Sequence, residues 1–145
     1  MKRYERNFIN HFGKQGLTIT IDKERYYGTE YFLLKEGYVD DTLKEAINNI
    51  FFKELSENMI EIISTNLSIP ANIEEKEIYI PYLNKKNIKV IELSKGNRKV
   101  IINKYFYDYF AGIGLTFKIG SSKKAPVRLY KGSECVGIVL PIVRG

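Results

Sequence analysis

The feature that most constrains the fold is the order of patterns in the last third of the chain. An apolar run over 100–102 is followed by an aromatic helical pattern over 104–111. Three short stretches, 115–119, 127–130 and 135–140, then follow, separated by polar turns that contain glycine. A period near 3.6 indicates a helix, and a period of two indicates a half-buried strand. The sequence therefore predicts a strand, a helix and three strands, in that order.

The helix over 104–111 carries its own start and stop signals. Asn103 precedes it, and asparagine is a favoured N-cap because its side chain accepts a bond from a first-turn amide. Gly112 and Gly114 follow it, and glycine commonly ends helices. The apolar face consists of four aromatic residues: Tyr105, Phe106, Tyr109 and Phe110.

The rest of the chain alternates between helical and strand patterns. A short helix is expected over 4–12, and a longer one over 42–55, which Asp40 and Asp41 open as capping residues. Strands are expected over 17–21, 26–35, 59–63, 77–80 and 88–93, with a hairpin turn at 95–98. The predicted class is α+β, with two helices packed on antiparallel sheets. A helix followed by three strands occurs near 42–93 and near 103–142, which suggests an internal pseudo-repeat without residue-level repetition.

Length and composition indicate one domain over residues 1–145, with 1–16 as an N-terminal helical extension. Hydrophobic residues make up 44% of the chain, which is enough for a core. Cys135 is the single cysteine, so no internal disulfide is expected, and a reducing cytoplasmic location is predicted. Neither a signal peptide nor a membrane span is expected, since no long apolar run occurs.

The net charge of +6 is unevenly distributed. Residues 37–81 hold 3 basic and 9 acidic side chains, whereas residues 82–145 hold 13 basic and 3 acidic ones. A basic segment of this kind is suited to nucleic acid or another polyanion. It is equally suited to the acidic segment of a second copy, which would give a homo-oligomer. The plain alternative is a set of solvated lysines that keep the protein soluble.

Three stretches near the end of the chain resemble the C-terminal domain of the bacterial DNA sliding clamp, the beta subunit of DNA polymerase III. They are residues 103–110 (NKYFYDYF), 125–130 (APVRLY) and 135–142 (CVGIVLPI). The resemblance implies a clamp-like domain in which two helices pack on curved antiparallel sheets and face DNA. It also implies a non-enzymatic accessory or binding module of DNA replication. This chain holds one domain where bacterial clamps join three, and this departure points to a phage or mobile-element origin. A self-assembling interaction module with no nucleic-acid role remains the alternative.

Two candidate binding sites follow. Sequence-independent DNA contact is expected from basic residues of the C-terminal half, namely Lys85, Lys86, Lys89, Arg98, Lys99, Lys104, Lys123, Lys124 and Arg128. Interleaved tyrosines would permit base stacking there. By position in the resemblance, a groove for a peptide of a replication protein would be formed by Val139, Leu140, Pro141 and Ile142.

No catalytic set, metal site or cofactor site is predicted. Cys135 begins an apolar strand and is expected to pack rather than react. His11 is the only histidine, so neither a histidine cluster nor a paired histidine can form. The acidic pair Asp40 and Asp41 is better explained as helix capping, and Glu74 and Glu75 as a solvated turn. A small enzyme acting on nucleic acid is the least supported interpretation.

Overall fold

The computed structural model describes residues 2–52, 61, 78–80, 89–95, 98–119 and 126–142. The first part contains α1 (Arg3–His11), β1 (Gln15–Ile21), β2 (Glu24–Thr29), β3 (Phe32–Lys35), the 3-10 turn η1 (Glu36–Tyr38), α2 (Asp41–Asn48) and β4 (Phe51–Phe52). The second contains β5 (Ile78–Ile80), β6 (Val90–Lys95), β7 (Arg98–Asn103), α4 (Lys104–Gly112), β8 (Thr116–Lys118), β9 (Val127–Lys131) and β10 (Glu134–Val139). The predicted α+β class is confirmed.

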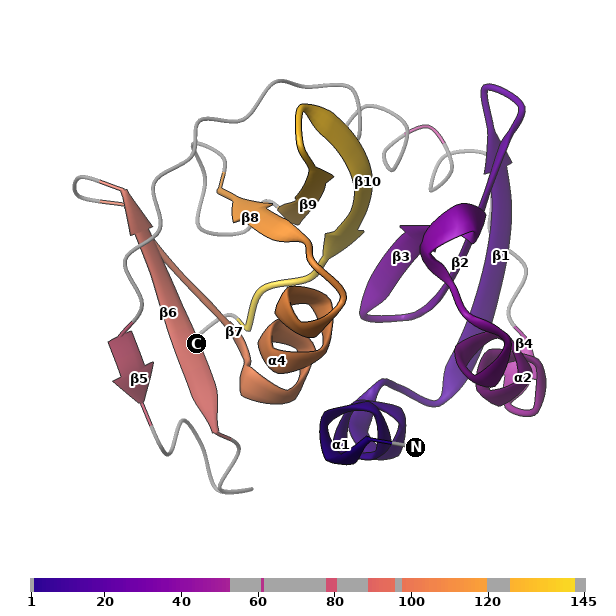
Figure 1. Ribbon diagram of the computed structural model, residues 1–145, viewed down its shortest axis with the longest axis horizontal. Helices are drawn as coiled ribbons and strands as arrows, with labels where there is room; N and C mark the ends of the chain where they lie inside the picture. The colour runs from indigo at the N-terminus through magenta and orange to yellow at the C-terminus, as the bar shows by residue number, and fades with distance from the viewer. Residues whose placement is uncertain are drawn as a thin grey trace.

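Two sheets organise these strands. The larger sheet has the order β4-β1-β2-β3-β10-β9-β8, and all of its pairs are antiparallel except β1 with β4. The smaller sheet has the antiparallel order β5-β6-β7. Helices α1 and α4 lie side by side, and β6 and β7 lie on the far side of α4 from α1 (Figure 1). The smaller sheet therefore lies against the α4 side of the helix pair.

The larger sheet consists of two similar halves. In each half a helix leads into a three-stranded meander: α1 into β1-β2-β3, and α4 into β8-β9-β10. The third strands meet at the centre, where Leu33 lies opposite Ile138. An ion pair between Lys35 Nζ and Glu134 Oε2 (2.9 Å) links the same two strands, and its hydrogen bond raises the pKa of Lys35. The pseudo-repeat is real, but its first half is the N-terminal unit and not the predicted 42–93.

Residue-level likeness between the halves becomes visible once the strands are paired. Residues 16–18 and 114–116 both read Gly-Leu-Thr, and residues 25–27 and 128–130 both begin with Arg and end with Tyr. In the first half Thr18 lies opposite Tyr27, and in the second Thr116 lies opposite Tyr130. The same residue types thus occupy the same register positions, contrary to the expectation that residue-level repetition is absent.

Helices α1 and α4 pack antiparallel through aromatic rings. Phe8 and Tyr109 occupy equivalent positions in the two nine-residue helices, and their rings stack with centroids 4.2 Å apart and planes at 8°. The start of each helix lies against the end of the other: Tyr105 stacks on His11, and Tyr4 abuts Gly112. These contacts describe an approximate two-fold axis through the stacked rings of Phe8 and Tyr109.

The predicted N-terminal helix is confirmed, and it belongs to the core. Phe8 is fully buried and its ring also contacts Phe32, Phe106 and Phe110. Burial of one such ring contributes about 2–3 kcal/mol to stability, because its apolar surface leaves water. The helix at residues 3–11 is thus an integral layer of the domain, where the sequence suggested an extension over 1–16.

The predicted helix over 42–55 is too long. Helix α2 begins after Asp40, whose carboxylate accepts a bond from the Leu43 amide (2.8 Å), as the capping prediction required. It ends at Asn48, and residues 51–52 pair with β1 instead. Consecutive asparagines at 48–49 favour this end because their side chains compete for backbone hydrogen bonds. The strand predicted over 59–63 lies outside the described residues, apart from position 61, which is helical and so contradicts the prediction at that residue.

Candidate functional site

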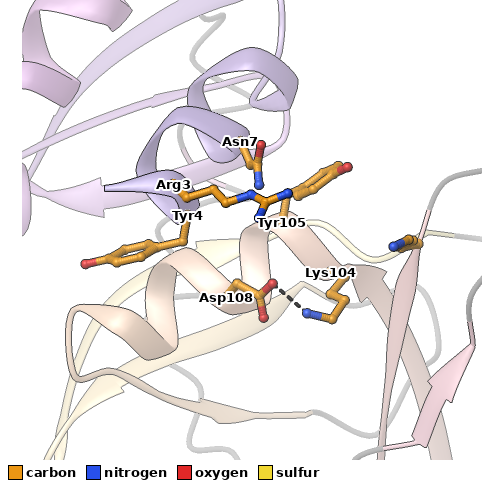
Figure 2. A pocket seen from close by; sticks show the side chains of 7 residues that line it. Arg3, Tyr4, Asn7, Lys104, Tyr105 and Asp108 are labelled. Carbon is orange, nitrogen blue, oxygen red and sulfur yellow. Dashed lines mark hydrogen bonds and ion pairs between the residues drawn. The ribbon is translucent and has the colours of Figure 1, made fainter. Parts of the chain in front are cut away.

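The antiparallel helix pair encloses a hollow of about 480 Å³ on its outer side. Three kinds of side chain line it: cations, tyrosines and short polar groups. They are Arg3, Tyr4 and Asn7 from α1, Lys104, Tyr105 and Asp108 from α4, and Lys89 at the start of β6. Figure 2 shows Arg3 reaching across the hollow toward Tyr105, with Asn7 above it and Asp108 below.

Equivalent positions of the two helices form this lining. Both helices begin with a cation followed by a tyrosine, and the third lining residue comes three positions after the tyrosine. The equivalent pairs are Arg3 with Lys104, Tyr4 with Tyr105, and Asn7 with Asp108. The hollow therefore lies on the approximate two-fold axis of the domain.

The charge of the hollow is positive and asymmetric. Lys104 Nζ lies 2.6 Å from Asp108 Oδ2 in an i,i+4 ion pair, whereas Arg3 has the neutral Asn7 at the equivalent position. Cations in the first turn of a helix are unfavourable because the helix dipole places partial positive charge there. Arg3 and Lys104 are both in this unfavourable position. An anion in the hollow would offset the repulsion, since it would lie near their positive charges.

Each of the two tyrosines that line the hollow packs against another ring. Tyr105 stacks on the imidazole of His11 with centroids 4.3 Å apart, and His11 Nδ1 donates a hydrogen bond to the carbonyl of Asn7 (2.8 Å). The ring centroids of Tyr4 and Tyr109 lie 6.0 Å apart. Burial raises the pKa of Tyr109 well above the ordinary range, so this phenol stays neutral beneath the hollow.

The structure separates the basic residues that the sequence grouped together. Lys89 and Lys104 line the hollow, and Lys99 is exposed on the β6–β7 hairpin with its Nζ 3.8 Å from Glu92. Arg128 is only 3% exposed, because β9 is covered on both faces, so its predicted phosphate contact is not available at the surface. The side chain of Arg98, and residues 85–86 and 123–124 with the lysines predicted there, lie outside the described part of the chain.

The predicted peptide groove at the C-terminal strand is only partly at the surface. Val139 is fully buried, so its side chain belongs to the core and does not face a partner. Leu140 is 41% exposed, and its amide donates to the carbonyl of Tyr31 (2.8 Å). Pro141 and Ile142 are half-buried, and the Ile142 amide donates to the carbonyl of Ile101 (2.7 Å). This segment therefore links the two sheets.

Sequence reasoning missed the contribution of α1. Arg3, Tyr4 and Asn7 were not candidates, since residues 1–16 were assigned to an extension. Asp108 was not a candidate either. The signal that would have identified them is the repeated cation-tyrosine pair at 3–4 and 104–105, which precedes the repeated Gly-Leu-Thr sequence in both halves.

The groups best known for catalysis are not assembled in the described ranges. Cys135 is half-buried, its Sγ lies 3.6 Å from the carbonyl of Gly137, and burial raises its thiol pKa. Within residues 2–52, 61, 78–80, 89–95, 98–119 and 126–142, no three or more His, Cys, Asp or Glu side chains gather as metal ligands would. The helices in those ranges are also too short or too polar to cross a membrane.

Comparison with protein-family models, with curated proteins and with solved structures finds no match to this chain.

Proposed function

We propose that the chain is a non-enzymatic nucleic-acid-binding module, built like one domain of a sliding clamp, that acts in DNA replication. The observation that carries the proposal is the hollow between α1 and α4, where three cations and two tyrosines meet a single carboxylate. A lining of this composition favours a phosphate-bearing ligand, because the cations pair with phosphate oxygens and the rings contact sugars or bases.

The arrangement of the helices supports the same proposal. The resemblance to the sliding clamp implies two helices side by side on antiparallel strands, with the helices toward DNA. Helices α1 and α4 lie in this way (Figure 1). The outward side of α1 is basic: Lys2, Arg3 and Arg6 are exposed there, as is Lys14 just beyond the helix. The basic face that a clamp helix needs is thus found on α1, whereas the longer helix predicted at 42–55 has a neutral one.

Binding of this kind is electrostatic and independent of sequence. Phosphate contacts position a protein on nucleic acid without reading the bases. Each phosphate that Arg or Lys neutralises releases counterions, so affinity falls steeply as salt rises. The logarithm of the association constant falls against the logarithm of the salt concentration with a slope of roughly −0.7 to −0.9 per phosphate contact. Arg3 offers the planar fork that suits a phosphate, and Lys89 adds a point charge.

The test is fluorescence anisotropy with a labelled oligonucleotide, from about 50 to 200 mM salt. We expect binding that weakens with salt, and Arg3→Gln should reduce affinity about tenfold, since it removes a charge-assisted contact. Lys44→Gln is the matched control: it removes one positive charge from α2, beside Glu36 and away from the hollow, and should change little. Equal losses in the two variants, or no binding at low salt, would contradict the proposal.

The self-assembling alternative rests on the opposite charges of residues 37–81 and 82–145. Head-to-tail contacts between such segments weaken as salt rises, because surface charges are screened. Light scattering over a range of protein concentrations separates the two candidates. A mass that grows with concentration at low salt favours assembly, and a constant monomer mass excludes it.

A further inference from the structure

We propose that the hollow between α1 and α4 takes a nucleotide of a single strand, with one base against Tyr105 and the neighbouring phosphate at Arg3 and Lys89. This inference rests on the proposed function and names the form of nucleic acid that the site selects. Duplex DNA, bound through its backbone alone, is the competing ligand.

The size of the hollow favours a single strand. A volume of about 480 Å³ lies in the range of sites that enclose one small molecule. A duplex is a stiff, convex cylinder with its bases stacked inside, so it offers such a hollow only phosphate and sugar. An unpaired nucleotide fills the hollow with its base and leaves its phosphates at the rim.

The aromatic lining favours the same ligand. Tyr4 and Tyr105 stand at equivalent positions on the two helices, and both line the hollow. Proteins that bind single strands combine a positive groove with rings on which bases stack, and this contact tolerates any base. A duplex that binds through its phosphates does not contact these rings. Replacing them by aliphatic side chains would then leave its affinity unchanged.

Tyr105 is oriented in advance for stacking. His11 covers one face of its ring at 4.3 Å, and the bond from His11 Nδ1 to the Asn7 carbonyl fixes the imidazole. A ring that is already held loses little conformational entropy when a base stacks on it, so more of the stacking energy appears as affinity. Figure 2 shows this ring at the mouth of the hollow, with the Arg3 side chain extended toward it.

The charges indicate on which side the phosphate lies. Asp108 holds Lys104 at 2.6 Å and repels an anion approaching the α4 side. Arg3 reaches across the hollow from α1, where the equivalent residue is the neutral Asn7. Lys89, whose carbonyl accepts a bond from the Lys104 amide (2.9 Å), adds a second positive charge beside the start of α4. The phosphate is therefore expected at the Arg3 guanidinium, next to a base at Tyr105.

The test compares a labelled oligothymidylate of about 12 nucleotides with a hairpin duplex of equal length at the same salt. We expect the single strand to bind at least tenfold more tightly. Tyr105→Leu should weaken it about tenfold while leaving duplex affinity unchanged, whereas Tyr105→Phe should bind like the wild type, because stacking needs the ring and not the hydroxyl. Tyr31→Leu is the matched control, since Tyr31 is exposed on the β2–β3 turn and does not line the hollow.

A second readout uses the wild-type protein alone. An oligonucleotide carrying 2-aminopurine should lose fluorescence on binding, because the probe stacks on a tyrosine, and this holds even if Tyr105→Leu fails to fold. Duplex binding as tight as single-strand binding, or a bound probe that is not quenched, overturns the inference and leaves the proposed function standing. Absence of binding to both nucleic acids removes the proposed function itself.

Discussion

The two halves of the larger sheet share a scaffold and differ in what surrounds their helices. Helix α4 lies between α1 and the strands β6 and β7 (Figure 1), whereas α1 exposes Arg3, Arg6 and Asn10 to solvent. At one equivalent pair of positions, Tyr107 of α4 stacks on Phe117 at 4.9 Å, while Arg6 of α1 is exposed. Neighbouring strands thus fix α4 as the aromatic helix and leave α1 free to carry charge. We therefore expect the proposed binding through this helix pair to depend mainly on the charges of the N-terminal half.

The largest expected effect breaks the contact between the halves. Phe8 is fully buried, with its ring stacked 4.2 Å from Tyr109 at the approximate two-fold axis. Phe8→Ala leaves a cavity there and should lower the free energy of unfolding by about 3–5 kcal/mol. Urea unfolding followed by circular dichroism measures this, and a loss below about 1 kcal/mol would show that α1 is a loosely attached extension.

The second prediction concerns the same axis at high pH. Burial raises the pKa of Tyr109, so the folded state keeps the phenol protonated above pH 10, where the unfolded chain releases that proton. The stability that depends on the neutral phenol is complete below pH 10 and is lost as pH rises, at about 1.4 kcal/mol per pH unit. Near pH 11, Tyr109→Phe should therefore lose about 1.4 kcal/mol less than the wild type.

The matching measurement is urea unfolding of both proteins at neutral pH and near pH 11. Lys35, whose pKa is also raised, contributes to the alkaline loss in both proteins and cancels in the comparison. Identical pH profiles would mean that Tyr109 ionises freely in the folded state and that the ring stack at the axis is open to water.

The third prediction concerns Asn7 and Asp108, the equivalent positions at which the two helices differ in charge within the hollow. Asp108→Asn gives both helices an amide at this position and removes the partner of Lys104. It should raise affinity for oligothymidylate about fivefold, because about 1 kcal/mol of repulsion is lost. Asn7→Asp places a carboxylate beside Arg3 and should lower affinity by a similar factor. Anisotropy titrations of the two variants should thus change in opposite directions, and changes of the same sign would exclude phosphate binding on the α1 side.

The smallest effects concern how the two helices begin. Asn103 caps α4 by accepting a bond from the Tyr105 amide (2.8 Å), whereas the side chain of Lys2 makes no capping bond to α1. Asn103→Ala should cost about 1 kcal/mol. Lys2→Ser should add about 0.5 kcal/mol, because it introduces a cap where the residue at that position now supplies none. Thermal unfolding of both variants measures the difference, and equal effects of the same sign would contradict the assigned caps.

The sequence predicted the C-terminal half more accurately than the N-terminal one. Asn103, the aromatic stripe of residues 104–111 and the glycines after it each specify local structure, and α4 with its three strands follows as expected. The error at 42–55 arose because Ile50 and Phe51 continue a helical apolar period, while residues 51–52 pair with β1 and leave the helix. A tertiary contact of this kind leaves no trace in periodicity.

The candidate site was harder to predict than the fold. Lys89 and Lys104 were found because they belong to a basic segment. Arg3 lies about a hundred residues away in the chain, and only the antiparallel packing of α1 on α4 brings it to them. Arg128 was grouped with them by charge alone, although β9 is covered on both faces, so that Arg128 is buried. Charge composition therefore suggested the class of ligand that we propose, and internal symmetry located the hollow.

The most direct test of this account is to titrate oligothymidylate into the ¹⁵N-labelled protein and follow the amide resonances. The account predicts that the largest shifts fall on residues 3–7 and 104–108, with Lys89 beside them, and that Arg3→Gln needs about tenfold more ligand to reach the same shifts. Shifts centred on Leu140 and Tyr31, or spread evenly over the exposed lysines, would contradict it.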